Sequence, residues 1–460
     1  MDKCYFTKVT RLFRMDKTTP SGTVVIPSEF LKGKKYTYES KLAFGLKEIN
    51  VRLLPGSSSG LIRLSQDIFK TFDLCDGMNV NVKLENGKLK IGPLIGVFMN
   101  EKAVNRLSHG NPTVKMAEMA KAAVNANVLV YFFTVTDIIW PDNSVNAVFY
   151  KPESNSWERR NIPLPDVLYD RGGGFSPESS VKARELRSRL NNIPGLKKIN
   201  AQHYFDKWDL HCRLSKHKDM AVYLPETVVY ENDLNVMAQI LRKHPAVYLK
   251  MRTGSNGKGI IRVRKQPDLL YEYSYFKDRI VQGYVNSLEE LILVARDLMN
   301  NRSFIIQQGI DVLTHQGNKV DVRVLVQRDE KGIWQITSMP TRIAVNDCAV
   351  TSTRSGSKVY RFEDAFNNIL EFYPRKVEGI KSDIERLIYT ATNTLEKEYG
   401  TFGELGIDVA IDKNLKLWFI ESNAKPAKDT ILISGTRADI EKSFRIPFEY
   451  CKFLTGFVTE

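Results

Sequence analysis

One stretch of the chain combines glycines and lysines in a pattern that could hold a phosphate group. Within Val247–Ile260, VYLKMRTGSNGKGI, a short β-favouring run ends in Lys250, and a loop follows that contains Gly254, Ser255, Asn256, Gly257, Lys258 and Gly259. Glycine accepts positive φ angles, so such a backbone can turn its N–H groups toward an anion. The spacing fits neither a P-loop nor a dinucleotide-binding fingerprint. An ordinary hairpin turn has the same composition, so this stretch alone leaves both interpretations open.

A second stretch, Gly406–Pro426, collects oxygen ligands for a metal ion. Alternation predicts one strand around Ile407–Asp412 and another around Leu417–Asn423, and a four-residue loop between them would put Asp408 opposite Glu421. The same geometry places Asn423 beside these carboxylates and the apolar side chains on the other face, namely Ile407, Val409, Ile411, Trp418 and Ile420. Two carboxylates and an amide suit Mg²⁺. A solvated strand face is the alternative, although directly opposed carboxylates are destabilising unless a cation lies between them.

A third stretch, Ser303–Gln327, lies between the other two. An apolar run ends at Gln307–Ile310, and after a Gln-Gly-Asn turn a second strand sets Asp321 and Arg323 on one face. The other face carries Val322, Val324 and Val326. A buried Arg beside an Asp is a frequent structural pair, and the arginine could equally reach a phosphate.

The order of these parts resembles the ATP-grasp superfamily, and within it the YheC/YheD-type, endospore coat-associated family. The resemblance rests on Lys250 with its glycine-rich loop, followed by Gln-Gln-Gly-Ile at 307–310, Asp-Val-Arg-Val at 321–324, Gly-Ile-Asp at 406–408 and Glu-Ser-Asn-Ala-Lys-Pro at 421–426. It covers roughly the last three-fifths of the chain firmly and the rest more loosely.

The resemblance implies that ATP and Mg²⁺ (or Mn²⁺) are held between two α+β lobes. Lys250 would bind the α- and β-phosphates, and the loop through Ser255, Gly257 and Gly259 would close over the triphosphate. The backbone between Gln308 and Ile310 would read the edge of the adenine. Lys207 matches the superfamily's first nucleotide lysine, with a helix-surface lysine as an equal alternative.

The same resemblance assigns the metal and the reacting groups. Asp408, Glu421 and Asn423 would hold the metal ion, and Arg323 would face the γ-phosphate or an acyl phosphate. The acceptor region departs from the family: many relatives carry an Asn-Leu-x-Arg-Gly-Gly-like segment, where this chain has Thr-Ser-Thr-Arg-Ser-Gly at 351–356. Arg342 and Arg354 remain as candidate catalytic clamps for an anionic substrate. Met251-Arg252 also replaces the Lys-Pro pair that usually precedes the loop.

The expected fold combines α/β and α+β parts. It is an ATP-grasp fold with a Rossmann-like layer before it and a small β-barrel-like domain at the N-terminus. The expected domains are residues 1–93, β-rich with a hairpin at Asn86-Gly87, residues 94–200, the Rossmann-like layer, and residues 201–460, the two-lobed ATP-grasp domain. The clearest helix is Ser382–Gly400, with a capping box at its start and a glycine at its end.

Composition limits the partners. The net charge of +14 is spread along the chain, and there is no zinc-ligand set, RNP-like motif or basic stripe interleaved with aromatics, so we expect no specific nucleic acid. The excess charge favours a polyanion: ATP, an acidic peptide or polymer, or anionic coat material.

The cysteines and the chain start indicate where the protein works. Five widely spaced cysteines with no CxxC pair are typical of reduced cytoplasmic thiols. No signal-peptide core opens the sequence, and no run approaches a transmembrane segment. The forespore surface or the spore coat is a second location, which the resemblance alone implies.

The expected function is that of an ATP- and Mg²⁺-dependent carboxylate–amine ligase acting through an acyl phosphate. Its carboxylate and amine substrates are not specified by the sequence, and spore coat proteins are candidate partners. A nucleotide-binding coat-assembly protein without catalysis is the alternative, which the unusual segment at 351–356 favours. Polyanion or nucleic-acid binding driven by charge is a third hypothesis, which the salt dependence of binding would test.

Overall fold

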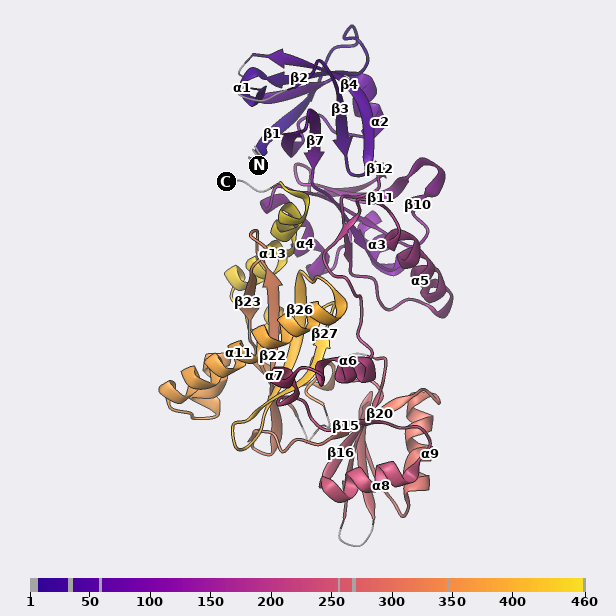
Figure 1. The fold of residues 1–460 in the computed structure, drawn as a ribbon, viewed down its shortest axis with the longest axis vertical. Coiled ribbons are helices and arrows are strands. Elements are labelled where there is room, and N and C mark those ends of the chain that lie inside the picture. The colour runs from indigo at the N-terminus through magenta and orange to yellow at the C-terminus, as the bar shows by residue number, and fades with distance from the viewer. Residues whose placement is uncertain are drawn as a thin grey trace. The chain divides into compact units, whose positions relative to one another are not determined.

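The computed structural model describes residues 7–31, 36–57, 60–254, 257–266, 270–345, 348 and 350–457. The chain divides into two compact units (Figure 1). Unit 1 comprises Met1–Asn200, Arg328–Ile333 and Phe444–Glu460, and unit 2 comprises Ala201–Gln327 and Trp334–Ser443. The division into domains at residues 1–93, 94–200 and 201–460 stays a prediction.

Unit 1 begins with seven strands that close into a barrel in the order β1-β5-β2-β4-β3-β7-β6. The strands are β1 (Thr7–Arg14), β2 (Thr23–Pro27), β3 (Glu39–Phe44), β4 (Lys47–Gly56), β5 (Leu61–Leu64), β6 (Asn79–Glu85) and β7 (Lys88–Gly92). The predicted hairpin between β6 and β7 is confirmed, and Asn86 and Gly87 at its turn both have positive φ angles, which these residue types tolerate best. Alternating side chains such as Leu12, Leu53 and Ile62 fill the interior.

The second sheet of unit 1 has parallel strands at its centre. Its order is β10-β11-β9-β8-β13-β14, with β12 paired to β11. The strands are β8 (Leu94–Phe98), β9 (Leu129–Phe133), β10 (Ile138–Ile139), β11 (Ser144–Lys151), β12 (Ser156–Pro163), β13 (Val167–Asp170) and β14 (Lys197–Lys198). Helices α3 (Glu101–Ser108) and α4 (Val114–Asn125) connect β8 to β9, and α5 (Pro177–Asn191) connects β13 to β14. Strands and helices therefore alternate in this part of the chain, and Val114 at the start of α4 is exposed.

The first sheet of unit 2 is antiparallel and has the order β15-β20-β16-β17-β18-β19. The strands are β15 (Thr227–Val229), β16 (Ala246–Met251), β17 (Ile260–Lys265), β18 (Tyr271–Lys277), β19 (Arg279–Val285) and β20 (Phe304–Gln308). Helices α8 (Leu234–Lys243) and α9 (Leu288–Met299) share one apolar cluster with the strand residues Val247 and Leu249. Lys250 pairs with Ile260 across β16 and β17, so the glycine-rich loop closes this hairpin.

The second sheet of unit 2 has the order β25-β24-β22-β26-β27, and β21 and β23 also pair with β22. The strands are β21 (Thr314–His315), β22 (Asn318–Arg328), β23 (Trp334–Ser338), β24 (Thr341–Ile343), β25 (Lys358–Tyr360), β26 (Glu404–Ile411) and β27 (Leu417–Asn423). Val322, Val324 and Val326 are fully buried in the core, as predicted for this face of β22. Asp321 and Arg323 therefore point away from that core.

Helix α11 (Pro374–Tyr399) packs on this second sheet and shares its core. Ile384 and Leu387 of this helix are buried in that core, and the helix ends at Gly400 as predicted. Its predicted start at Ser382 is wrong, because the helix begins at Pro374. Proline lacks an N–H and its fixed φ suits the first helical turn, so it can open a helix without any capping box.

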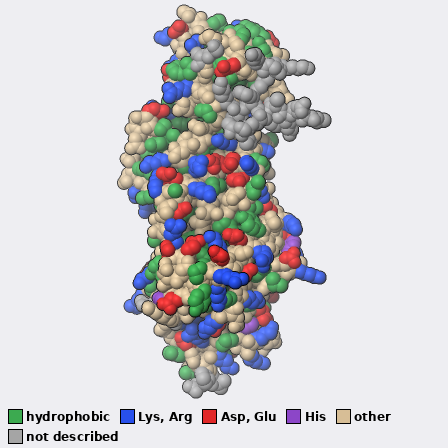
Figure 2. Space-filling view, turned by 90° about the vertical axis from the view of Figure 1, so that its left-hand side faces the viewer, with side chains coloured by type: hydrophobic (Ala, Val, Ile, Leu, Met, Phe, Trp, Pro, Cys, Tyr) green, Lys and Arg blue, Asp and Glu red, His purple; other side chains and the backbone are tan. Residues whose placement is uncertain are grey.

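Three further features of the described residues can be compared with the sequence. In the described ranges, no helix is long and apolar enough to cross a membrane. Cys75, Cys212, Cys348 and Cys451 are free thiols. Figure 2 shows Lys and Arg side chains scattered among Asp and Glu on the face it presents.

Candidate functional site

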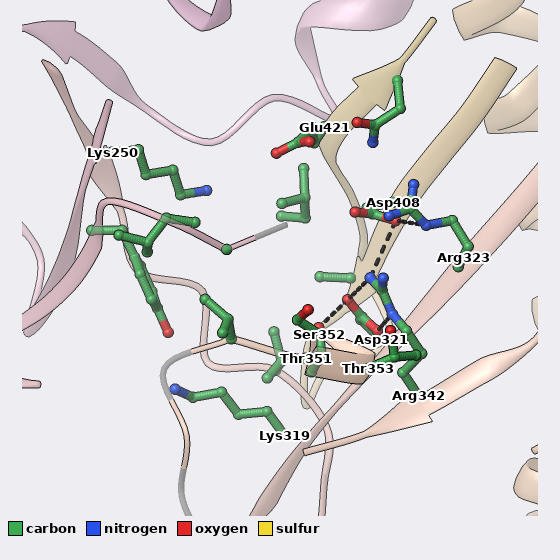
Figure 3. Close-up of a pocket in the computed structure, with 18 of the residues that line it drawn as sticks. Lys250, Lys319, Asp321, Arg323, Arg342, Thr351, Ser352, Thr353, Asp408 and Glu421 are labelled. Atoms are coloured by element: carbon green, nitrogen blue, oxygen red, sulfur yellow. Dashed lines mark hydrogen bonds and ion pairs between the residues drawn. The ribbon is translucent and has the colours of Figure 1, made fainter. Parts of the chain in front are cut away.

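Residues from both sheets of unit 2 line one pocket of about 340 Å³ (Figure 3). The predicted site residues in its lining are Lys250, Gly257, Gln308, Ile310, Arg323, Arg342, Asp408, Glu421 and Asn423. They come from four separate stretches of sequence, so the fold brings the glycine-rich and acidic stretches to the same cavity.

Three predicted residues are not in that lining, and a fourth cannot be compared with it. Lys207 begins helix α6 (Lys207–Leu214), and its Nζ lies 3.6 Å from Glu421 Oε2 and donates to Gly254 O at 3.1 Å, so it borders the pocket. Gly259 packs against Met251. Arg354 is exposed in a short helical turn at Thr353–Ser355, and Ser255 lies outside the described residues. The proposed clamp role of Arg354 therefore has no support from its position.

Lys250 is a buried cation at the end of β16. Its Nζ donates to Gln307 Oε1 at 2.5 Å, and its side chain has no ion pair among the described residues. Burial lowers the pKa of Lys250 to about 8, although the negative charges of Glu421 and Asp408 oppose this shift. A buried ammonium that ordinary solvation does not stabilise is well suited to bind an incoming anion.

The glycine-rich loop needs glycine at two of its positions. Gly257 has φ +73°, and a Cβ there would lie 3.1 Å from Val350 Cγ2. Gly259 has φ +63°, and a Cβ would lie 2.3 Å from Met251 Cε. Any other residue would thus be strained and crowded, so the glycines allow the loop to approach both β16 and the segment around Val350.

In the linker after β20, a backbone N–H could donate to the edge of a base. Gln308 N donates to Glu226 O at 2.8 Å and Gly309 N donates to Ala246 O at 2.8 Å. Within the described hydrogen bonds, Ile310 N is the linker N–H that remains available. Ile310 also lines the pocket, so a base at this place would meet an apolar wall and a single donor.

The predicted pairing of Asp408 with Glu421 is confirmed, although the turn between the two strands is not the four-residue loop on which the prediction was based. Ile411 pairs with Leu417, so the turn is one residue longer than predicted, and the register shifts between Asp408 and Val409. Ile420 is the extra residue of this β-bulge, and it restores the opposition of the two carboxylates.

The same bulge makes two side-chain predictions wrong. Ile420 was expected in the core and instead lines the pocket. Trp418 was expected in the core and instead lies opposite Ala410, with its Nε1 donating to Asp412 Oδ2 at 3.0 Å. Leu417 and Phe419 fill the core in their place.

Four charged side chains form a cluster in the pocket. Arg342 Nε and Nη2 donate to the two oxygens of Asp321 at 2.8 and 2.5 Å. Arg342 Nη2 also lies 3.2 Å from Asp408 Oδ1, and Arg323 Nε lies 2.7 Å from the same oxygen. Both of these contacts to Asp408 Oδ1 are ion pairs. Figure 3 shows Asp321 and Asp408 on either side of Arg342.

The two arginines therefore differ in what they can still bind. Burial alone would lower the pKa of Arg342, but the carboxylates of Asp321 and Asp408 raise this pKa above its ordinary value. The guanidinium of Arg342 therefore stays charged and is already paired with these carboxylates. Arg323, in contrast, uses only Nε for an ion pair among the described residues, which leaves its terminal nitrogens for a ligand.

The predicted metal ligands fit a Mg²⁺ ion that shares a nucleotide's phosphates. Lys207, Arg323 and Arg342 already offset part of the repulsion between the carboxylates of Glu421 and Asp408. The fact that these two carboxylates face each other therefore does not by itself require a metal ion. Asn423 Nδ2 is buried and has no hydrogen-bond partner among the described residues, and the amide could turn over to present its oxygen there. Among the described residues, no group of three or more His, Cys, Asp or Glu could hold a metal ion. Two carboxylates, an amide and substrate phosphates are a set that Mg²⁺ accepts.

Sequence reasoning missed several lining residues, and the alternation of the strands could have found two of them. Lys319 precedes Asp321 by two positions on β22, and Tyr248 precedes Lys250 by two positions on β16, so each shares the pocket face. The Nζ atoms of Lys250 and Lys319 both lie 5.6 Å from the centre of the Tyr248 ring. The remaining lining residues include Val350, Thr351, Ser352, Thr353, Lys425, Ala427, Asp429 and Thr430.

Comparison with protein-family models gives one match for this half of the chain. The model described as "YheC/D like ATP-grasp" matches residues 195–454. This range includes all the pocket residues named above.

Curated relatives match a larger share of the chain. The endospore coat-associated protein YheD of Bacillus subtilis (strain 168) is 24% identical over 451 residues, which cover 96% of each chain. The endospore coat-associated protein YheC of the same organism is 24% identical over 340 residues, which cover 74% of this chain and 91% of the relative.

Solved structures similar to the chain include two synthetases. The D-cycloserine synthetase DcsG has a TM-score of 0.49 and 11% identity, covering 78% of this chain and 99% of its own. D-alanyl-alanine synthetase A from Vibrio cholerae O1 biovar eltor str. N16961 has a TM-score of 0.44 and 13% identity, covering 79% and 98%.

Proposed function

Because this chain belongs to the YheC/D-like ATP-grasp family and has its fold, we propose that it is an ATP- and Mg²⁺-dependent carboxylate–amine ligase. The observation that supports this most is the single pocket lined by Lys250, Arg323 and the Asp408–Glu421 pair, which come from two different sheets. A triphosphate needs cations on one side and a metal site on the other, and this pocket offers both.

The proposed reaction has two steps. A carboxylate oxygen of the first substrate attacks the γ-phosphorus of ATP, the bond from that phosphorus to the β,γ-bridging oxygen breaks, and ADP leaves. The amine of the second substrate then attacks the carbonyl carbon of the acyl phosphate, inorganic phosphate leaves, and an amide forms as the amine loses a proton.

The residues of the chain would act by positioning and charge neutralisation. Lys250 would hold the α- and β-phosphates, and the terminal nitrogens of Arg323 would face the γ-phosphate. Asp408, Glu421 and Asn423 would hold Mg²⁺, which supplies neutralisation of the charge that builds on the phosphate oxygens. Because the phosphate is transferred directly, no Ser or Cys nucleophile is required.

Lys207 and Lys319 extend this phosphate site. Lys207 contacts both Gly254 and Glu421, so it would bridge the loop and the metal side of the nucleotide. Lys319 would supply a further cation near the Tyr248 ring, as Lys250 does.

A nucleotide-binding coat-assembly protein without catalysis is the second candidate. Arg354 is exposed and does not line the pocket, and the hydroxyl of Thr351 already donates a hydrogen bond to Asp321. The acceptor side therefore supports catalysis less than the nucleotide side does.

We also propose a location and partners. The printed names of the two relatives, both endospore coat-associated proteins, support a place at the forespore surface or spore coat, or in the cytoplasm where the coat is assembled. Coat proteins and an acidic peptide or polymer are the proposed partners. The N-terminal residues 1–93 would serve partner binding or structure, and residues 94–200 would shape the acceptor side.

Two assays separate the candidates. The first is a thermal-shift screen of the full chain. ATP or ADP with Mg²⁺ should raise the apparent stability of the chain, because a ligand stabilises the state it binds. Phosphate release would then be measured over a panel of amino acids, acidic peptides and amines. Turnover with one pair supports the ligase, binding without turnover on any pair supports the assembly protein, and the absence of binding contradicts both.

A further inference from the structure

The segment Val350–Ser357 is held as a compact turn beside the pocket. Ser355 Oγ donates to Ser352 O at 2.8 Å and to Val350 O at 3.3 Å, and Ser352 Oγ accepts from Arg354 N at 3.2 Å. These bonds fix the backbone, so Thr351 presents its hydroxyl from a defined place.

Thr351 connects this segment to the charged cluster. Its Oγ1 donates to Asp321 Oδ2, the oxygen that also accepts from Arg342 Nη2. The same Arg342 nitrogen reaches Asp408 Oδ1. A continuous path of contacts therefore runs from a hydroxyl in the acceptor segment to a carboxylate proposed as a metal ligand.

The cluster around this path is buried and electrically balanced. The side chains of Arg342, Asp408 and Asp321 are 7%, 12% and 14% exposed. Two carboxylates face two guanidinium groups, and Asp408 Oδ1 contacts both arginines, so a shift of Arg342 would change the orientation of the Asp408 carboxylate. In such a buried network, a hydrogen bond at one end also helps to fix the groups further along it.

Val350, the residue before Thr351, links the segment Val350–Ser357 to the glycine-rich loop. Gly257 lies so close to Val350 that a Cβ would come within 3.1 Å of its side chain. The segment thus touches the loop that would cover the triphosphate and the cluster that would orient the metal ligand.

We infer that Thr351 is a positioning residue for the metal side of the nucleotide site: its hydroxyl, acting through Asp321 and Arg342, fixes the Asp408 carboxylate for the divalent cation. This inference rests on the proposed function. It also gives a role to a position where the chain departs from the Asn of many relatives. Threonine would thereby hold the cluster and would not contact the acceptor.

The test compares nucleotide binding with and without metal in the full chain. ADP affinity would be measured by calorimetry in EDTA and in saturating Mg²⁺ for the wild type, Thr351→Val and Thr351→Ser. Thr390→Val is the matched control, because Thr390 on α11 donates its hydroxyl to a helix carbonyl, Arg386 O, and does not line the pocket. Thermal unfolding of each variant checks the fold.

We expect the loss to appear only in the metal-dependent part of binding. In EDTA, the ADP affinity of Thr351→Val should stay within about twofold of the wild-type value. The factor by which Mg²⁺ raises the ADP affinity should be roughly tenfold smaller in Thr351→Val than in the wild type, which is the usual effect of losing a group that orients a metal ligand. Thr351→Ser keeps the hydroxyl and should retain the gain, as should Thr390→Val.

Three results would overturn the inference. The increase in ADP affinity that Mg²⁺ gives could persist in Thr351→Val, or it could vanish equally in Thr351→Ser. It could also fall in Thr351→Val together with the ADP affinity in EDTA, and this third result would show a general structural role. A wild-type chain that binds ADP without any Mg²⁺ effect would remove the metal from the proposed function. A wild-type chain that binds no nucleotide would remove the proposed function itself, and this inference with it.

Discussion

Asp408 on β26 lies directly opposite Glu421 on β27, and each carboxylate meets a cation from a different element. Arg323 of β22 contacts Asp408, and Lys207 of α6 contacts Glu421. The pair is therefore held from two sides in a pocket that Lys250 enters from the other sheet (Figure 3).

Replacing Glu421 by Gln should abolish most Mg²⁺-dependent ATP turnover. The substitution keeps the size of the side chain and removes one of two carboxylates that would hold the metal, so we expect a loss of about 100-fold or more. Glu441→Gln on the exposed surface of helix α13 (Arg437–Thr455) is the matched control. Equal phosphate release by the wild type and Glu421→Gln would remove Glu421 from the mechanism.

Nucleotide affinity should depend on the protonation of Lys250. With a pKa of about 8, Lys250 is mostly charged below pH 8 and mostly neutral above it. Only the charged form attracts phosphate, so the affinity for ADP in EDTA should be greatest below pH 8. It should fall above pH 8 by at most about tenfold per pH unit. Calorimetry across this range measures the effect.

Lys250→Arg provides the control for that pH profile. Arginine stays charged throughout the range, so the fall near pH 8 should disappear in this variant. A wild-type affinity that is flat from pH 7 to pH 10, or an Arg variant with the same inflection as the wild type, would contradict the assignment.

Lys319→Met should weaken ATP binding by roughly tenfold, since one charge-assisted contact is lost while the alkyl stem remains. Lys397→Met on the exposed face of α11 removes the same charge outside the pocket and should have no such effect. A fluorescence or calorimetric titration distinguishes the two variants. Identical affinities would show that Lys319 does not contact the nucleotide.

Gly259→Ala should destabilise the protein, because Gly259 has φ +63° and its Cβ would collide with Met251. We expect a decrease in the free energy of unfolding on the order of 1–2 kcal/mol, with weaker nucleotide binding. Gly379→Ala is the control: Gly379 lies in α11 with open space around it, so alanine should stabilise the helix by up to about 1 kcal/mol. Urea unfolding would reveal the opposite signs, and two equal shifts would be evidence against the loop geometry.

Glu404→Gln should be among the most destabilising changes in unit 2. Glu404 is fully buried and accepts from Lys428 Nζ at 3.0 Å, whose side chain is also buried. The substitution removes the negative charge from a buried ion pair and leaves the other charge buried, which costs about 3–5 kcal/mol. Urea denaturation measures this, with Glu441→Gln in the exposed Arg437–Glu441 pair as a near-neutral comparison. A loss below about 1 kcal/mol would contradict this account of the pair.

Much of the site followed from strand alternation, and the errors have local causes. The face of β22 that carries Asp321 and Arg323 was correct because Val322, Val324 and Val326 need a core. The β26–β27 hairpin was correct at Asp408 only because a longer turn and the bulge at Ile420 cancel each other. A bulge leaves no local sequence signal, so Trp418 and Ile420 were assigned to the wrong side.

Other features depend on tertiary contacts that a sequence does not display. Arg342 contacts Asp321 and Asp408 only because β24, β22 and β26 lie side by side in the folded sheet. The exposure of Arg354 depends on how the turn at Thr353–Ser355 is placed. The start of α11 at Pro374 in place of Ser382 shows the reverse case, where a plausible capping box lies inside a longer helix.

The most direct measurement is a calorimetric titration of the full chain with ATP and Mg²⁺, performed on the wild type, Lys250→Met and Glu421→Gln. If the two sheets bind the same triphosphate, the wild type should bind one ATP per chain and each variant should bind that ATP more weakly. Wild-type affinity in both variants, or two independent sites that the variants affect separately, would show that Lys250 and Glu421 do not share a ligand.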